Sequence, residues 1–317
     1  MPAKLTALSH LGLAVETILG TPVAATGWVP VLTFKPQDVL KYIEDTGYRG
    51  QPVEDYGEYL GVTSSTYEVD GDFFPGSGGN FLSAIFGKDT VTGTAAPYTH
   101  TFSTLGTGLP SYTISDYYVA GARQWAGSRC DKLSLKFTAD AGLTYTASFI
   151  GFPSATYSVE SSTTFGTSPF FLGWEAVLKF AGVQDANLES FTLDLQRVKS
   201  AALFSAANTK SPYDIFLGPL KASWQLSFFA NDDTEYTKAL SQATTATQVV
   251  VTQPGTGDSL TLTSSAVQFT KPTINRGKDY VVVDISGEAV YNATDASVAT
   301  AVLVNATSAA YSTTAAS

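Results

Sequence analysis

Hydrophobic and polar residues alternate along many short segments of this chain, and glycine, proline, asparagine and aspartate separate one segment from the next. Alternation with a period of two places one kind of side chain on each face of a β-strand. The segments are also rich in Thr, Val, Tyr and Phe, which favour strands. The pattern predicts an all-β fold with strands at residues 29–34, 64–74, 97–103, 110–119, 132–139, 143–151, 176–182, 189–196, 221–230, 247–253, 258–264, 266–274 and 279–291.

Two short helices interrupt the β pattern. The first is predicted at residues 80–86, with Asn80 as its N-cap and Gly87 as the residue that ends it. The second is predicted at residues 232–241, where acidic residues occupy the first turn. The glycine-rich segment FPGSGGN (74–80) lacks the lysine of a phosphate-binding loop, so a flexible turn into the first helix explains it better.

The order of the predicted elements occurs twice along the chain. Each half runs through a strand, a long excursion, a second strand, a helix, further strands and a closing hairpin. This order predicts two β modules, each with one flanking helix, at residues 27–153 and 170–292, joined by the Ser/Thr-rich linker 154–169. Two unrelated β domains are the alternative.

Residues 1–26 and 293–317 lack the spacing for a core of their own, so they are predicted to be extended terminal arms that pack mainly on neighbouring subunits. In the first arm, polar residues interrupt the apolar ones, and Pro22 biases the residue before it away from helix. The interruption also argues against a signal peptide. The second arm is small and polar without an amphipathic period, which is typical of a flexible or docked terminus.

The composition indicates a surface of unusual kind. Charged residues make up 15% of the 317 residues, against roughly 25% in ordinary globular proteins. Such a surface suits a protein that is largely covered by copies of itself. The net charge of −10 argues against a protein that grips nucleic-acid phosphates, although nucleic acid can pass nearby without binding. No run of about 18 apolar residues predicts a transmembrane helix.

Catalytic chemistry has little support in the sequence. The two histidines, His10 and His100, lie in the N-terminal arm and in a predicted strand, where structural roles are expected. A single cysteine, Cys130, excludes an intrachain disulfide and a cysteine-based metal cluster. A glycosidase-type carboxylate pair stays open, because a β protein with 28 acidic residues offers many candidates. We expect no enzyme, no cofactor and no metal.

One group of acids has a regular spacing. Glu68, Asp70 and Asp72 alternate with Tyr67 and Val69, so a strand would place the acids on one face and the apolar residues on the other. Weaker candidates of the same kind are Asp194, Asp284 and Glu288. Three interpretations compete: an ordinary solvent-facing strand, a calcium site, and an acidic wall that faces a channel. Lys132 and Lys136 alternate on a neighbouring hairpin and would partly neutralise this face.

The chain resembles the tail tube proteins, or major tail proteins, of long-tailed, non-contractile bacteriophages. The resemblance lies in GLAVETILGTPVAATGWVPV (12–31), in the long loop after the first strand, in the strand–helix unit 64–86 and in the closing hairpin. It implies β-sandwich modules whose inner sheets join neighbouring copies into a closed barrel. The rings stack into a tube through which DNA leaves the virion.

The resemblance also implies partners and a location. The chain would assemble with itself, in rings of three copies with pseudo-sixfold symmetry because the modules are duplicated, or in rings of six. Tail tip and tail terminator proteins would bind the tube, and tape measure protein and DNA would occupy the lumen without specific binding. Assembly would take place in the host cytoplasm, the mature location would be the virion tail, and no membrane would be involved.

Three groups of residues receive expected roles. The channel would be lined by Glu68, Asp70, Asp72, Asp194, Asp284 and Glu288. The loop 38–61, which is longer than a hairpin needs, would reach the adjacent ring through Glu44, Asp45, Tyr48, Arg49, Glu54, Asp55 and Tyr56. The N-terminal arm would contact a neighbouring subunit through Gly12, Glu16, Thr17, Gly20, Thr21 and Pro22. A carbohydrate-binding adhesive protein and a β-rich hydrolase are the alternatives of other classes.

Overall fold

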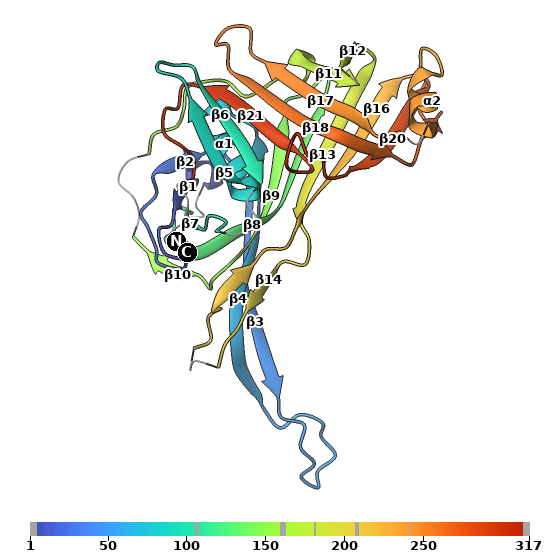
Figure 1. The fold of residues 1–317 in the computed structure, drawn as a ribbon. Helices are drawn as coiled ribbons and strands as arrows, with labels where there is room; N and C mark the ends of the chain where they lie inside the picture. Colours follow the sequence, from blue (N-terminus) through green and yellow to red (C-terminus); the bar gives the residue numbers. More distant parts are fainter. Residues whose placement is uncertain are drawn as a thin grey trace.

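The computed structural model describes residues 5–104, 108–158, 163–180, 182–206, 209–241 and 243–312. Within them the chain forms a body of packed β-sheets with two α-helices, and a long hairpin projects from that body (Figure 1). The predicted all-β class with minor helix is confirmed. Parts of the predicted arms and linker (1–4, 159–162 and 313–317) lie outside the described residues.

The first half contains β1 (His10–Val15), β2 (Gly27–Val29), β3 (Thr33–Glu44), β4 (Glu58–Asp72), α1 (Pro75–Phe86), β5 (Gly87–Thr92), β6 (Tyr98–Thr104), β7 (Tyr112–Tyr117), β8 (Ala122–Thr138), β9 (Thr144–Gly151) and β10 (Ala155–Tyr157). The second half contains β11 (Ala176–Phe180), β12 (Val183–Asp185), β13 (Leu188–Arg197), β14 (Ala201–Leu203), β15 (Asp214–Phe216), β16 (Leu220–Phe229), α2 (Thr234–Leu240), β17 (Thr245–Thr252), β18 (Ser259–Phe269), β19 (Thr273–Asn275), β20 (Val282–Ala289) and β21 (Thr300–Asn305).

One antiparallel sheet, here called the main sheet, runs through both halves. Its strands lie in the order β3, β4, β9, β8, β13, β16 and β20, and the end of β18 together with β19 forms the last strand. The pairing of β8 with β13 joins the first half to the second. The predicted linker therefore does not separate two independent sheets.

The first parts of β8 and β18 leave the main sheet and build a second layer. There β8 pairs with β7 and β10, while β1 and β2 extend the layer beyond β7. In the same way β18 pairs with β17 and β21, while β11 and β12 extend the layer beyond β17. The hairpin of β5 and β6 adds to β21. Long strands that change sheets thus connect the two layers.

The same connectivity occurs in both halves. Seven strands of the first half have neighbours that correspond to those of seven strands of the second half: β1, β3, β4, β7, β8, β9 and β10 match β11, β13, β16, β17, β18, β20 and β21. The exceptions are the outer sides of β3 and of β18 with β19, and the additional pairing of β21 with β6. Even a register shift recurs, between Tyr112 and Ile114 in β7 and between Thr245 and Thr247 in β17. The repeated unit takes in β1 and β21, so it is wider than the predicted modules.

The buried faces of the two layers meet in one hydrophobic core that spans both halves. Tyr67 and Val69 of β4 point into it, as their alternation with the acids predicts. From the second half, Trp224 is fully buried, and its indole N–H donates to the Ser264 hydroxyl at 2.9 Å. One face of the main sheet is therefore committed to the core.

Helix α1 begins earlier than predicted, at Pro75, so the glycine-rich segment is not a flexible turn. Proline suits the first helical position, where its missing N–H has no partner to lose. A Cβ at Gly78 would lie 2.3 Å from the ring of Phe73, and one at Gly79 would lie 2.2 Å from the ring of Tyr311. The glycines let both rings pack directly against the helix backbone.

Arg197 of β13 fixes the other end of α1. Its buried guanidinium donates to the backbone carbonyls of Ile85 (2.9 and 3.0 Å) and Phe86 (3.1 Å). A helix leaves its last carbonyls without partners, so this contact satisfies them. Burial lowers the pKa of Arg197 to about 10, but this value is still high enough for the guanidinium to be charged at neutral pH. The contact ties a second-half strand to the first-half helix.

Residues 10–26 fold onto the chain's own body, which corrects the prediction of an arm that reaches a neighbour instead of its own core. Strand β1 pairs with β2 and β7, and Leu11 and Leu13 lie in the core. Local sequence does not reveal that β1 is a core strand, because its partner β7 is about a hundred residues away in the sequence.

Glu16 fastens this segment. Its buried carboxylate accepts hydrogen bonds from the backbone N–H of Gly20 (2.9 Å) and Gly127 (2.8 Å). It also accepts from the hydroxyls of Ser111 and Thr113, both at 2.8 Å. Four donors from three parts of the chain satisfy the buried charge without a cation among them.

Residues 293–312 also fold onto the body, so the prediction that they pack mainly on neighbouring subunits is wrong for this range. Strand β21 lies between β18 and β6. Tyr311 is buried beside α1, and its hydroxyl donates to the Gly76 carbonyl at 3.1 Å. The C-terminal segment is thus part of the sandwich.

His100 holds this C-terminal segment in place. Its Nδ1 lies 2.9 Å from the Asp89 carboxylate, and its Nε2 lies 2.8 Å from the Thr307 carbonyl oxygen. Both partners are acceptors, so the doubly protonated imidazolium makes both hydrogen bonds. Burial lowers the pKa of His100, but the bonds to Asp89 and Thr307 outweigh it, and the pKa is raised overall.

The stability that His100 contributes is expected to depend on pH. It is fully present below about pH 6.5, the ordinary pKa of histidine, and is lost as pH rises through the raised pKa of the folded protein. The loss is about 1.4 kcal/mol for each unit by which the pKa is raised. Denaturant unfolding of the wild type and of His100→Gln between pH 6 and 9 measures it. A stability difference between the two proteins that stays constant over this range would contradict the assignment.

Candidate functional site

The outward face of the main sheet is polar across all of its strands. Cross-strand pairing places these side chains in rows, and the central row is Thr33, Asp70, Thr146, Ser134, Asp194, Ser223, Glu288 and Gln268. The rows beside it are Lys35, Glu68, Ser148, Lys132, Gln196 and Lys221, and Asp72, Thr144, Lys136, Thr192, Gln225 and Ser286. A shorter row is Thr138, Ser190, Ser227, Asp284 and Thr273. We call these four rows the polar face.

The structure brings all six acids that were singled out in the sequence to this one face. Three come from β4, one from β13 and two from β20, in the order Glu68, Asp70, Asp72, Asp194, Asp284 and Glu288. Residues far apart in the sequence therefore share a surface, because each strand alternates core and polar side chains in a common register.

Lysines on neighbouring strands balance most of this acidic charge. Four of the six carboxylates form ion pairs: Lys35 with Glu68 (3.6 Å) and Asp70 (4.0 Å), Lys132 with Asp194 (3.6 Å), and Lys221 with Glu288 (2.6 Å). Asp284 instead accepts a hydrogen bond from the Ser227 hydroxyl at 2.6 Å. With Lys136, the rows hold four lysines against six acids, so the face is close to neutral and not a purely acidic wall.

The sequence indicated Lys132 and Lys136 as neutralising residues but missed Lys35 and Lys221. Lys35 lies just past the predicted end of the first strand, although its alternation with Thr33 continues the polar pattern. Lys221 begins a predicted strand, yet only the pairing of β16 with β20 reveals that it stands beside Glu288.

The predicted long loop 38–61 is instead the end of a β-hairpin, which we call the hairpin arm. Strands β3 and β4 remain paired as far as Glu44 and Glu58, and the arm extends far beyond the body (Figure 1). The prediction of a loop is corrected because the strands continue through it, and only residues 45–57 form the tip. Pro36 cannot donate a ladder hydrogen bond, and it is accommodated because β3 lies at the edge of the sheet.

The tip of the arm is braced by its own side chains. Arg49 forms an ion pair with Asp45 and lies over the ring of Tyr56, 4.6 Å from its centroid. The hydrogen bond from Arg49 lowers the pKa of Asp45, and a backbone N–H from Gly47 adds to the effect. Tyr48 is fully exposed.

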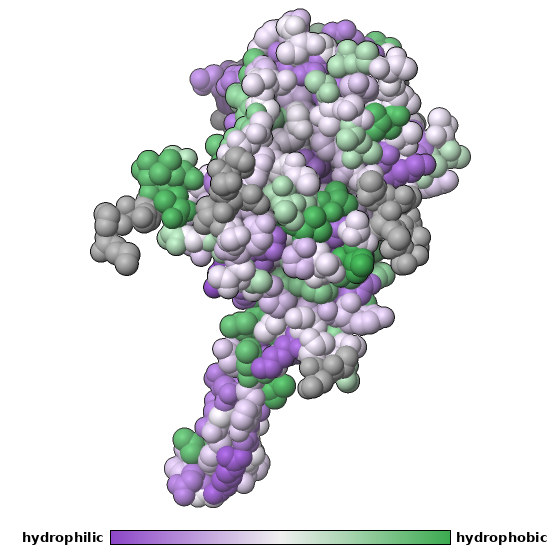
Figure 2. Space-filling model, turned by 90° about the vertical axis from the view of Figure 1, so that its left-hand side faces the viewer, coloured by the Kyte–Doolittle hydropathy of each residue, from purple (hydrophilic) through white to green (hydrophobic). Residues whose placement is uncertain are grey.

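The arm carries apolar pairs on both of its faces. Tyr42 lies opposite Leu60, and Ile43 lies opposite Tyr59, and all four side chains are exposed. Figure 2 shows apolar and polar side chains interspersed along the projecting arm. A two-stranded ribbon has no interior, so neither face can be buried within this chain. The contact residues predicted from the sequence lie at or beside the tip and do not include these two pairs.

A shorter hairpin of β14 and β15 supports the base of the arm. The Thr63 N–H of β4 donates to the Lys210 carbonyl at 2.8 Å. Arg129 of β8 pairs with Asp214 of β15 at 2.9 Å. The arm is therefore anchored at its root.

The N-terminal residues predicted to contact a neighbour divide into two sets. Gly12 and Glu16 are buried, and Gly20, with φ of +75°, turns the chain beside Phe152. Thr17, Thr21 and Pro22 are exposed at the tip of this turn.

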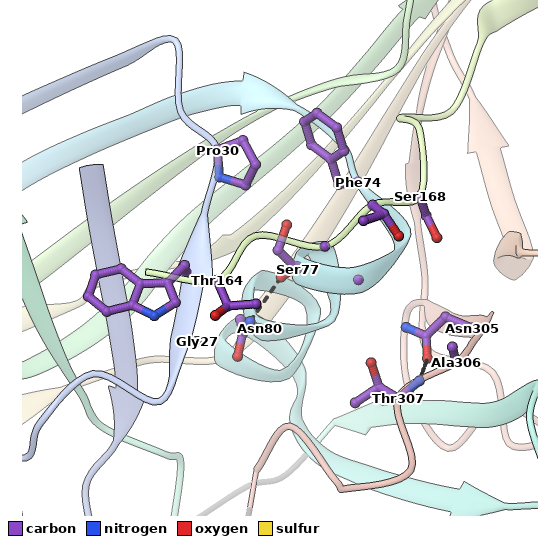
Figure 3. Close-up of a pocket in the computed structure, with 14 residues that line it drawn as sticks. Gly27, Pro30, Phe74, Ser77, Asn80, Thr164, Ser168, Asn305, Ala306 and Thr307 are labelled. Atoms are coloured by element: carbon purple, nitrogen blue, oxygen red, sulfur yellow. Dashed lines mark hydrogen bonds between the residues drawn. The ribbon is translucent and has the colours of Figure 1, made fainter. Parts of the chain in front are cut away.

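A cavity of about 360 Å³ lies where the start of α1, strand β2 and the segments 164–168 and 305–307 meet (Figure 3). Asn80 lies inside α1, not at its N-cap, and its side-chain amide donates to the Ser77 carbonyl at 3.0 Å. None of the described residues that line the cavity is charged. These residues therefore offer no titratable side chain for acid–base chemistry.

Among the described residues, no three His, Cys, Asp or Glu side chains are grouped so that they could hold a metal ion. In the same part of the chain, neither helix is long and apolar enough to cross a membrane. Cys130 is buried, and burial raises the pKa of its thiol well above the ordinary value.

The sequence model of the family described as "Phage tail tube protein" matches residues 6–289. The chain belongs to this family. A comparison with curated proteins found no match. The resemblance stated from the sequence is therefore confirmed: this is a structural, β-rich protein of the bacteriophage virion, located in the tail, where it assembles into a tube with other tail components.

Proposed function

We propose that this tail tube protein polymerises into stacked rings whose polar faces together line the channel through which DNA leaves the virion. The observation that carries the proposal is the polar face itself. It runs unbroken across every strand of the main sheet, on the side opposite the core. On both sides the sheet ends in a strand for which the described part of the chain supplies no outer partner. Closing such a sheet through copies of itself removes the free edges.

The chemistry of the polar face suits a conduit. Its rows contain hydroxyl, amide and charged side chains without aromatic anchors on which bases could stack. Three of its four lysines are engaged with carboxylates, which leaves little free positive charge for phosphates. The excess of carboxylates gives a mild repulsion, which screening limits to about 8 Å from the wall at physiological ionic strength. DNA and tape measure protein would thus pass without specific binding.

Ring stacking is assigned to the hairpin arm and to the exposed turn of Thr17, Thr21 and Pro22. In the arm, the apolar pairs of β3 and β4 supply contact area. Specificity toward the adjacent ring comes from Glu44 at the end of β3 and from the tip residues Asp45, Tyr48, Arg49, Glu54, Asp55 and Tyr56. Tip and terminator proteins would bind the ends of the tube, and assembly would take place in the host cytoplasm. No enzymatic activity belongs to this proposal.

Rings of three copies are favoured over rings of six. The same connectivity occurs twice in each chain, so three chains present six similar units around the axis, as a pseudo-sixfold ring requires. The two units correspond approximately to the modules 27–153 and 170–292, widened to include β1 and β21.

Reversing charge on the polar face tests the channel assignment. The triple variant Glu68→Lys, Asp70→Lys, Asp72→Lys is expected to fold with nearly unchanged stability, because the lost ion pairs involve exposed or half-exposed groups. Its tubes should retain short duplex DNA at low salt and release it as salt rises. Filter retention after nuclease treatment, with tubes verified by electron microscopy, provides the measurement.

The control is Glu68→Gln, Asp70→Asn, Asp72→Asn, which removes the carboxylates without adding positive charge. It should retain much less DNA than the lysine variant, because its polar face carries four lysines against three acids instead of seven against three. Tubes of the lysine variant that retain no DNA would overturn the channel assignment. A wild-type chain that forms neither rings nor tubes would overturn the proposed function as a whole.

A further inference from the structure

The main sheet ends in two unpaired edges. Among the described residues, strand β3 pairs only with β4, and β19 pairs only with β20. Both edges are exposed, and each contains a proline (Pro36 and Pro272). Proline is found in sheets mainly at edges, because it cannot donate a ladder hydrogen bond. The two edges lie at opposite ends of the same sheet.

The junction between the halves shows how such edges fit together. There β8 pairs with β13 in a fixed antiparallel register, with Ser134 opposite Asp194 and Leu135 opposite Leu193. The leucines are buried, and the polar pair belongs to the polar face.

The repeated connectivity gives each free edge a counterpart in this junction. In the second half Phe191 pairs with Leu226, and in the first half Phe34 pairs with Val69. Phe191 and Phe34 differ by 157 in residue number, and so do Leu226 and Val69. Strand β3 therefore corresponds to β13, and Gln37 stands in the place of Asp194.

The other edge corresponds to β8 by the same argument. Thr273 pairs with Asp284 in the second half, as Ser134 pairs with Thr146 in the first. A one-residue bulge precedes the pair in both places, in β8 and in the edge strand made of the end of β18 and β19. The bulge lies between Cys130 and Lys132 in β8. Thr273 therefore stands in the place of Ser134.

We propose that residues 271–275 of one copy pair antiparallel with β3 of the next copy in the register of the internal junction. Thr273 then lies opposite Gln37, Ile274 opposite Pro36, and Asn275 opposite Lys35. The proposal rests on the proposed function, since it specifies how rings of this chain close. The partner is a second copy of the chain, because the internal junction already shows a matching pair of edges.

The chemistry of the edges fits this pairing. Ile274 is 39% exposed in the single chain, whereas its counterpart Leu135 is fully buried. Pairing would cover Ile274 and continue the polar face from Thr273 to Gln37 without interruption. The prolines remove one N–H donor from each edge, so the contact between copies is weaker than the internal junction.

Cysteine cross-linking tests the register. The Ala139 N–H donates to the Glu189 carbonyl, so these two opposite residues form a hydrogen-bonded pair. Hydrogen-bonded and non-hydrogen-bonded pairs alternate along an antiparallel ladder. Ser134 and Asp194 are five positions along this ladder and therefore form a non-hydrogen-bonded pair. The Cα atoms of such pairs lie about 4.5 Å apart, within the range of a disulfide. The corresponding variant is Gln37→Cys with Thr273→Cys.

Tubes of this variant are expected to form intermolecular disulfides on mild oxidation, at least tenfold faster than tubes of the control Val39→Cys with Thr273→Cys, whose cysteines are two residues out of register. The three positions that are substituted, Gln37, Val39 and Thr273, are exposed, so folding should persist, and circular dichroism verifies it. The native Cys130 is buried and is present in both proteins.

The outcomes separate the register from the function beneath it. Tubes that form but show no preferential cross-link would overturn the register and leave the tube function standing. Failure of the wild-type chain to assemble would overturn both. Because each chain is linked at both edges, denaturing gels of the fully oxidised variant end at three chains for a ring of three and at six for a ring of six.

Discussion

Replacing Glu16 with alanine is expected to destabilise the folded chain by about 3–6 kcal/mol, because it leaves the buried backbone N–H of Gly127 and that of Gly20 without an acceptor. The hydroxyls of Ser111 and Thr113 lose the same partner. Each buried donor left unsatisfied costs about 1–3 kcal/mol. Denaturant unfolding followed by circular dichroism measures the loss.

Two comparisons make this result specific. Glu16→Gln keeps one acceptor oxygen and should give an intermediate loss, because the amide nitrogen cannot accept from a backbone N–H. Thr17→Ala, at the exposed neighbouring position, should change stability by less than about 0.5 kcal/mol. A loss below about 1 kcal/mol for the alanine variant would show that Glu16 does not fasten the segment.

The position of Glu16 also bears on truncation. A detachable arm would be dispensable for folding, whereas β1 places Leu11 and Leu13 in the core and adds a strand to the second layer. Removing residues 1–20 should therefore unfold or severely destabilise the chain, not merely prevent its assembly.

Shortening the hairpin arm is expected to abolish tube formation while leaving the body intact. Replacing residues 42–60 with an Asn-Gly turn removes the exposed pairs Tyr42 with Leu60 and Ile43 with Tyr59, none of which contributes to the core. Burial of one large apolar side chain stabilises a contact by about 1.5–3 kcal/mol, so the concentration needed for assembly should rise by about a hundredfold or more. Sedimentation and electron microscopy measure the change.

Paired serine variants show which face of the arm docks. Tyr42→Ser with Leu60→Ser changes one face, and Ile43→Ser with Tyr59→Ser changes the other, with equal numbers of apolar groups removed. Assembly of the shortened chain into tubes at the wild-type concentration would rule out the arm as the stacking contact.

The length of the arm shows where local pattern misleads. In TFKPQDVLKYIE, apolar residues fall on both faces and a proline interrupts the segment, so alternation ends at residue 34 when one buried face is sought. The strand nevertheless continues because β4 pairs with it along its length. Its apolar residues are exposed in the single chain, so a search for a core face cannot detect them.

The sequence by itself determined the all-β class, the repeated order of elements and the face of each strand on which Glu68, Asp70 and Asp72 lie. These follow from a period of two and from local punctuation, which any stretch of chain carries within itself. The tertiary structure decided which distant segments meet: β1 with β7, and Lys221 with Glu288. Pairing register and burial are properties of two segments at once, so they turned a predicted arm into a core strand and an acidic row into a charge-balanced face.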